Sequence, residues 1–271
     1  MVGGQPFDFV PIPAERSWEK PRGVGRTMII DWGLDLARQA QFLIMAGRFV
    51  DIAKIPVGSA RLYDESYLAE KMALYKAHAV LTYIGGGFVE HMFATEGMDS
   101  LPRFFAEVHR LRFDVVEISD NYIPLNAEQR RRQIGMAQDA GLTVYGEVGS
   151  KHIENDAATL IAQSEECFAA GAEAVMLEGG EFVVGGRVKT EMVEGLRQGL
   201  DLGRAIIEVP GTWNSGAEPS VIHDLKKMLI ATFGPNVNLG NIMPDEIIDT
   251  ETMRVGLGVV QPTEPLHGKD D

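Results

Sequence analysis

The sequence lacks the features that would place the protein in a membrane or in an oxidising compartment. Its 271 residues include one cysteine, Cys167, so no disulfide can form within the chain. No apolar run approaches the roughly 20 residues that a membrane-spanning helix needs. The N-terminus has no basic stretch followed by an apolar core, which is the pattern of a secretory signal. We therefore expect a cytoplasmic protein without a membrane partner.

Positive charge is also scarce. The chain has 25 lysines and arginines against 39 aspartates and glutamates, a net charge of −14. Nucleic-acid-binding surfaces are typically basic, so the composition argues against a nucleic-acid partner. A few cations placed in a cleft can still attract a small anion, whatever the average charge. A small anionic substrate is therefore compatible with this composition.

What the sequence does contain is a regular alternation of short apolar runs and longer amphipathic stretches. The apolar runs are residues 26–31, 49–54, 79–84, 114–119, 142–148, 174–178, 204–209 and 236–241. Their continuous Val, Ile and Leu content is typical of strands buried on both faces. Eight such units predict a (β/α)₈ TIM barrel over residues 26–258, with an open doubly wound sheet as the alternative. We expect an N-terminal extension over residues 1–25 and a flexible tail over 259–271.

Charged residues mark the ends of these predicted strands. In a (β/α)₈ barrel such positions converge on one face, where the active site is built. Crowded carboxylates repel one another unless cations or shared protons neutralise them. Oxygen ligands without a histidine–cysteine cluster favour Mg²⁺. The residues concerned are Asp31, Lys54, Glu117, Glu147, Glu178 and Glu208.

The segment after the eighth predicted strand is a candidate phosphate site. Many barrels bind phosphate with backbone N–H groups after strands seven and eight and at a helix N-terminus. Asn238, Gly240 and Asn241 lie in this region, and Arg254 could add a positive charge. The glycine-rich segment 179–186 after the sixth strand is typical of a mobile active-site loop.

Eight segments, in order along the chain, resemble the phosphosulfolactate synthase family of coenzyme M biosynthesis. The resemblance runs from Arg22 to Leu257, and VEISD, EVGSK and VNLGNI are specific in combination. The segments are RGVGRTMIIDWG, FVDIAK, YIGGGFVEH, VVEISDNYIPL, EVGSK, AVMLEGGE, IIEVP and FGPNVNLGNIMPDEIIDTETMRVGL.

The resemblance implies a barrel enzyme that adds sulfite to C3 of phosphoenolpyruvate with Mg²⁺ and a lysine general acid. It implies catalytic roles for Lys151, Lys54 and Glu147. The expected metal ligands are Glu117, Glu147, Glu178 and Glu208, and the expected substrate-binding residues are Asp31, Asn238, Gly240, Asn241 and Arg254. We also expect a homo-oligomer.

The sequence departs from the family pattern around this core. Two positions where the family carries arginine are Gly180 and Gly258 here, and the segment 211–220 is longer than its family counterpart. Arginine is the natural bidentate partner of phosphate and sulfonate, so recognition of the substrate anions differs. Two alternatives stay open. One is a different enzyme on the same barrel, such as a Schiff-base aldolase using Lys54 or Lys151. The other is a non-catalytic paralogue.

Overall fold

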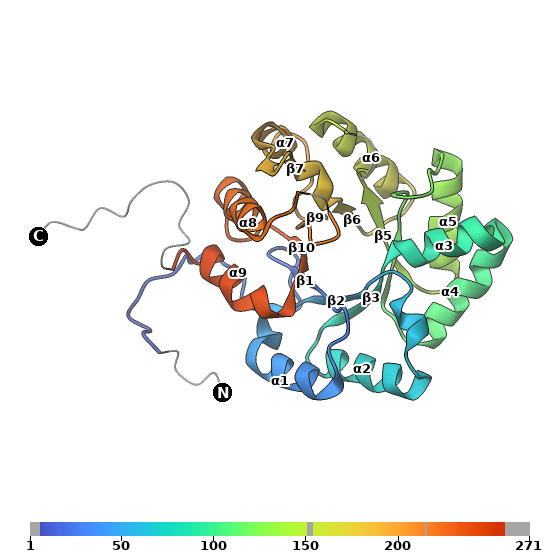
Figure 1. The fold of residues 1–271 in the computed structure, drawn as a ribbon, viewed down its shortest axis with the longest axis horizontal. Coiled ribbons are helices and arrows are strands. Elements are labelled where there is room, and N and C mark those ends of the chain that lie inside the picture. The colour runs from blue at the N-terminus through green and yellow to red at the C-terminus, as the bar shows by residue number, and fades with distance from the viewer. Residues whose placement is uncertain (1–5, 151–153, 215, 258–271) are drawn as a thin grey trace, which may run out of the picture.

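The centre of the computed structural model is a closed barrel of eight parallel strands (Figure 1). The structure describes residues 6–150, 154–214 and 216–257. The barrel strands are β1 (Thr27–Ile30), β2 (Ile52–Ile55), β3 (Leu81–Ile84), β4 (Val115–Ile118), β5 (Thr143–Val148), β6 (Ala174–Leu177), β9 (Ala205–Glu208) and β10 (Leu239–Ile242). Because β1 pairs with both β2 and β10, the sheet closes on itself and the predicted TIM barrel is confirmed.

Helices form the outer ring around these strands (Figure 1). Asp35, Asn126 and Asp156 each accept a hydrogen bond from a backbone N–H in the first turn of the helix that follows, and so cap α1, α5 and α6. The helices are α1 (Leu36–Ala46), α2 (Glu65–Ala77), α3 (Gly86–Glu96), α4 (Leu101–Arg110), α5 (Ala127–Asp139), α6 (Ala157–Ala169), α7 (Thr190–Leu196), α8 (Pro219–Phe233) and α9 (Ile247–Arg254). No described helix is both long and apolar enough to cross a bilayer.

The predicted strands all overlap observed ones, but two begin three residues later than expected. Residues 47–49 form a short 3₁₀ helix, so β2 starts at Ile52. Residues 236–238 precede β10, and the side chains of Asn236 and Asn238 bind neighbouring backbone there. The segment expected to be a mobile loop contains a 3₁₀ helix over Gly179–Phe182 and an antiparallel pair, β7 (Val183–Val184) and β8 (Arg187–Val188).

The barrel interior consists of an apolar plug with a charged layer above it. Side chains alternate between the two faces of a strand, so inward positions recur every second residue. On β5, for example, Tyr145 belongs to the plug and Glu147 lies one inward position closer to the strand's end. The plug consists of Met28, Ile52, Tyr83, Val115, Tyr145, Ala174, Met176 and Ile206. The opening at the C-terminal ends of the strands is called the mouth here. The plug separates it from the opposite end of the barrel.

Part of the predicted N-terminal extension is buried against the base of the barrel, at the N-terminal ends of the strands. Arg16 makes a bidentate contact with Glu251 of α9, with N–O distances of 2.8 and 3.2 Å. Arg22 binds Asp51 at 2.8 Å, and only 7 % of Arg22 is exposed. These ion pairs connect residues before the first strand to the barrel itself.

Removing Arg22 should leave the Asp51 carboxylate buried without its counter-charge. We expect Arg22→Ala to lower the free energy of unfolding by about 3–5 kcal/mol. Arg132→Ala is the control, because its partner Asp99 is exposed and such pairs contribute at most about 1 kcal/mol. Urea unfolding of the three proteins measures both values. Equal losses in the two variants would contradict a stabilising role for the N-terminal segment.

Candidate active site

Five charged side chains form the layer above the plug, one from each of five strands. All five are at least 93 % buried, with exposed fractions of 7 % or less. They are Lys54 of β2, Glu117 of β4, Glu147 of β5, Glu178 directly after β6 and Glu208 of β9. The structure therefore brings together the lysine and the four glutamates that the strand ends predicted.

Lys54 is the cation at the centre of this layer. Its Nζ lies 2.8 Å from Oε2 of Glu117 and 2.9 Å from Oε1 of Glu208. The Tyr83 hydroxyl donates to Glu117 Oε2, and the Gly86 backbone N–H donates to Oε1 at 2.7 Å. Glu117 thus has a full set of partners, and it holds Lys54 in one place over the plug.

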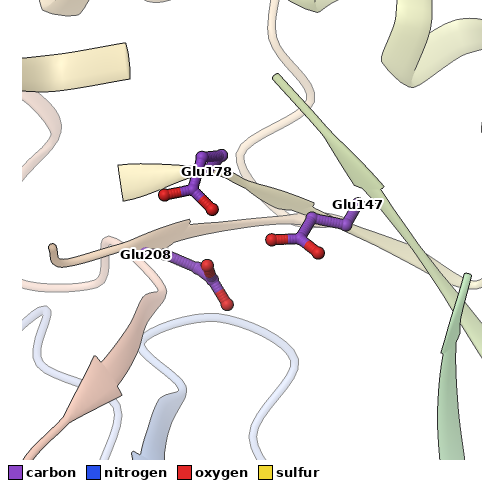
Figure 2. Close-up of side chains that lie close together, drawn as sticks. All are labelled: Glu147, Glu178 and Glu208. Atoms are coloured by element: carbon purple, nitrogen blue, oxygen red, sulfur yellow. The ribbon is translucent and has the colours of Figure 1, made fainter. Parts of the chain in front are cut away.

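The remaining carboxylates converge on a single point. Figure 2 shows the side chains of Glu147, Glu178 and Glu208 pointing toward one another. One oxygen from each lies within 4.8 Å of the other two. Glu178 also accepts hydrogen bonds from the Gly180 N–H at 3.0 Å and from Asn214 Nδ2 at 3.2 Å. Such a group of buried oxygen ligands could hold a metal ion.

Burial and neighbouring charges shift the pKa values within this layer. Burial, reinforced by the charges of Glu117 and Glu208, raises the pKa of Glu147 well above its ordinary value. Burial also raises the pKa of Glu208 to about 7, against the opposing charge of Lys54. Burial would lower the pKa of Lys54, but the surrounding carboxylates raise it well above the ordinary value. Without a metal, the layer therefore retains protons that isolated glutamates would lose.

Asn241 reaches the mouth through an irregularity in β10. Thr27 pairs with Leu239 and Ile29 pairs with Ile242, so two steps along β1 match three steps along β10, an irregularity of the β-bulge type. Asn241 has a φ of 56° there and lines the central cavity, and its Oδ1 has no hydrogen-bond partner among the described residues. Bulges commonly redirect a side chain beside an active site. Asn241 is therefore positioned to contact a ligand.

The other three residues of the predicted phosphate site do not join it. Asn238 lies at the base, where it accepts from Arg26 N–H and donates to the carbonyls of Leu202 and Ala205. Arg254 lies at the same end and donates to the carbonyl of Val237 at 2.6 Å. A Cβ atom on Gly240 would lie 3.0 Å from the Met28 and Met176 methyl carbons, so Gly240 faces the plug. These three residues lie away from the mouth.

Asp31 points outward from β1, toward the helices. Its carboxylate contacts Lys71 Nζ at 2.5 Å and accepts from the Tyr75 hydroxyl at 2.6 Å, both on α2. It also accepts from the backbone N–H groups of Gly33 and Leu34. Asp31 thus supports the turn after β1 and does not line the central cavity.

The predicted catalytic Lys151 lies outside the described residues. The chain on either side of it is held by Glu181, which is 3 % exposed. Glu181 accepts from the Ser150 N–H at 2.8 Å and from the Asn155 N–H at 3.2 Å. Gly149 has a φ of 100°, a left-handed conformation that favours glycine.

The central cavity also has lining residues that the sequence reasoning missed. Its volume is about 100 Å³. Trp32, Asn121, Tyr122 and Trp213 line it from the loops after β1, β4 and β9. Glu90 holds the loop after β4 by accepting from Ser119 Oγ and from two backbone N–H groups. Loop residues carry no periodic signal, so only their position directly after a strand could have indicated them.

Comparisons with known proteins agree with this architecture. The family described as (2R)-phospho-3-sulfolactate synthase (ComA) matches residues 15–259. The phosphosulfolactate synthase of Methanocaldococcus jannaschii is 31 % identical over 86 % of this chain and 92 % of its own length. The protein heat-stress-associated 32 of Arabidopsis thaliana is 26 % identical over 87 % of each chain. The carboxyl transferase domain of Rhizobium etli pyruvate carboxylase, solved with pyruvate and biocytin, shares the fold with a TM-score of 0.59. The two are 13 % identical, and the match covers 84 % of this chain and 41 % of that one.

The fold and the charged mouth define a (β/α)₈ barrel with a candidate active site at the C-terminal ends of its strands. The match over nearly the whole barrel is more specific than the fold alone. The chain belongs to the (2R)-phospho-3-sulfolactate synthase family. The resemblance seen in the sequence is therefore confirmed at the level of the family.

The raised pKa of Glu208 makes the stability of the metal-free protein depend on pH. The folded carboxyl, with a pKa of about 7, keeps a proton that the unfolded chain releases above about pH 4.5. The retained proton therefore contributes to the free energy of unfolding. That contribution is complete below about pH 4.5 and is lost as the pH rises to about 7. We expect Glu208→Gln, which cannot titrate, to gain stability relative to the original protein between pH 5 and 7.5.

Urea unfolding in the presence of a chelator measures this difference at each pH. The control is Glu65→Gln, because Glu65 lies on the surface and pairs with Arg110. Parallel stability curves for Glu208→Gln and the original protein would show that Glu208 does not titrate in this range.

Proposed function

We propose that this protein is a Mg²⁺-dependent lyase that adds a nucleophile, sulfite in the family, to phosphoenolpyruvate or a related enol acid. The observation that carries the proposal is the convergence of Glu147, Glu178 and Glu208 beside the Lys54 ammonium. Family membership supports the reaction class. For this activity we expect a cytoplasmic homo-oligomer.

The three carboxylates fit a magnesium ion by their chemistry and spacing. Magnesium binds oxygen ligands at about 2.1 Å in an octahedron, which separates ligand oxygens by about 3 to 4 Å. The oxygens of the trio, all within 4.8 Å of one another, need only small movements to reach that spacing. A bound Mg²⁺ would supply positive charge to an anionic oxygen of the substrate. Glu117 is occupied by Lys54, Tyr83 and Gly86, so we place it next to the metal site as the partner of Lys54.

Lys54 suits an electrostatic role better than a nucleophilic one. Two carboxylates within 2.9 Å and a raised pKa keep it as an ammonium ion. A Schiff-base lysine must instead be neutral to attack a carbonyl. These contacts favour a lyase over an aldolase that uses Lys54. We propose that Lys54 binds the negative charge of the substrate beside the metal ligands.

Addition to an enol acid also requires a proton. As the nucleophile bonds to C3, the double bond becomes single and C2 takes up a proton while the phosphate stays in place. We propose that Lys151 delivers this proton, as its motif implies. Glu181 anchors both flanks of the segment that carries Lys151, which supports its placement at the mouth.

Magnesium binding is testable apart from catalysis. We expect isothermal titration calorimetry to show Mg²⁺ binding to the original protein, and about tenfold or weaker affinity for Glu178→Gln because a ligand charge is lost. Glu90→Gln is the matched control, since Glu90 is equally buried at the mouth but binds loop groups. Unchanged affinity in Glu178→Gln would remove that residue from the metal site.

The reaction can be followed by ³¹P NMR with phosphoenolpyruvate, sulfite and Mg²⁺. We expect Lys54→Met to lower kcat by about 100-fold or more, since it removes a preorganised charge from the reacting centre. Lys226→Met is the control, because Lys226 is a buried lysine that pairs with Glu246 and Asp249 on the outside of the barrel. Magnesium binding without product would exclude this pair of substrates and leave the reaction class standing.

A further inference from the structure

Two tryptophans form the outer wall of the central cavity. Trp32 follows β1 and Trp213 follows β9, the two neighbours of β10 in the barrel. Their ring centroids lie 5.6 Å apart with an interplanar angle of 52°. Trp32 is 48 % exposed and Trp213 is 38 % exposed, so each retains a face that a ligand can cover. The pair lies at the open side of the mouth, beyond the charged layer.

The chain on both sides of this pair is held in place. The turn after Trp32 is fixed by Asp31, which accepts from the N–H groups of Gly33 and Leu34. Trp213 lies over Gly211, where a Cβ atom would be 2.3 Å from the ring. The next residue, Asn214, donates to Glu178 at 3.2 Å. The aromatic wall is therefore connected to the proposed metal site.

Uncharged polar atoms complete the wall. Asn241 lies on β10, between the strands that the two tryptophans follow, and within the described part of the chain its Oδ1 has no hydrogen-bond partner. Asn121, on the loop after β4, has an Oδ1 in the same state and is 5 % exposed. Buried amide oxygens without partners are rare in proteins, and at a cavity they are candidates for ligand contacts. Both amides line the cavity that the tryptophans cover.

In the part of the chain that the structure describes, positive charge does not extend to this outer wall. Among the described residues that line the cavity, Lys54 is the one cation, and Glu117 and Glu208 engage it. An anionic group at the wall would lose hydration without gaining a counter-charge from those residues. A flat apolar group would instead gain burial and ring contacts.

We propose that Trp32 and Trp213 form an aromatic clamp that binds an uncharged, apolar or aromatic substituent of the substrate. This inference rests on the proposed function, in which the carboxylate end of the substrate binds beside the metal ligands and Lys54. The substituent would extend from that end toward the open mouth. It would lie with the pair of rings on one side and the amides of Asn121 and Asn241 on the other. Within the proposed function, the substrate of this chain is then a related enol acid whose outer side group is apolar or aromatic.

Three α-hydroxy acids with the same head test this specificity. Lactate carries no substituent at C3, 3-phenyllactate carries a phenyl ring, and 3-sulfolactate carries a sulfonate. We expect calorimetry in Mg²⁺ to give 3-phenyllactate about tenfold or more tighter binding than lactate, as burial of a ring predicts. We expect 3-sulfolactate to bind no tighter than lactate. Tighter binding of 3-sulfolactate than of 3-phenyllactate would overturn the clamp and leave the proposed function intact.

Variants show whether the tryptophans cause the preference. Trp32→Ala should remove the advantage of 3-phenyllactate over lactate, and Trp32→Phe should retain most of that advantage. Trp18→Phe is the control, because Trp18 packs against Phe49, away from the cavity. An unchanged ratio in both Trp32→Ala and Trp213→Ala overturns the clamp. If none of the three acids binds in Mg²⁺, the result contradicts the proposed function of the charged layer, on which the clamp depends.

Discussion

The mouth of this barrel depends on one buried cation, the Lys54 ammonium. Four glutamates are buried around it, and like charges in so small a volume cannot all ionise without a counter-charge. Lys54 stabilises Glu117 and Glu208 directly, at 2.8 and 2.9 Å. The remaining negative charge must be neutralised by protons or by a bound cation. The same imbalance that raises the pKa of Glu147 thus makes the layer suitable for a metal.

The two ends of the barrel are organised for different purposes. At the base, Arg16, Arg22 and Asn238 bind acidic or backbone partners, and they connect the N-terminal segment to the strands. At the mouth, the amide oxygens of Asn121 and Asn241 have no hydrogen-bond partners among the residues that the structure describes. Satisfied polar groups contribute to stability, whereas unsatisfied groups at a cavity remain available to a ligand.

One departure from the family pattern coincides with the aromatic clamp. At Gly180, where the family resembled here carries arginine, a Cβ atom would lie 3.2 Å from Asn214 Nδ2. Asn214 belongs to the extended loop after β9, next to Trp213. A large side chain at position 180 would crowd this contact. Gly180 and the loop after β9 are therefore connected in space beside Glu178.

The sequence by itself determined the barrel and its charged layer. Strand order and the alternation of inward positions place Lys54, Glu117, Glu147 and Glu208 on one face whatever the loops do. Only the tertiary structure decided which flanking residues reach the mouth. Asn238 comes before β10 and belongs to the base, while a bulge brings Asn241 into the cavity. Trp32 and Trp213 are in contact because only β10 lies between the strands that they follow. Barrel closure, and not distance along the chain, makes these strands near neighbours.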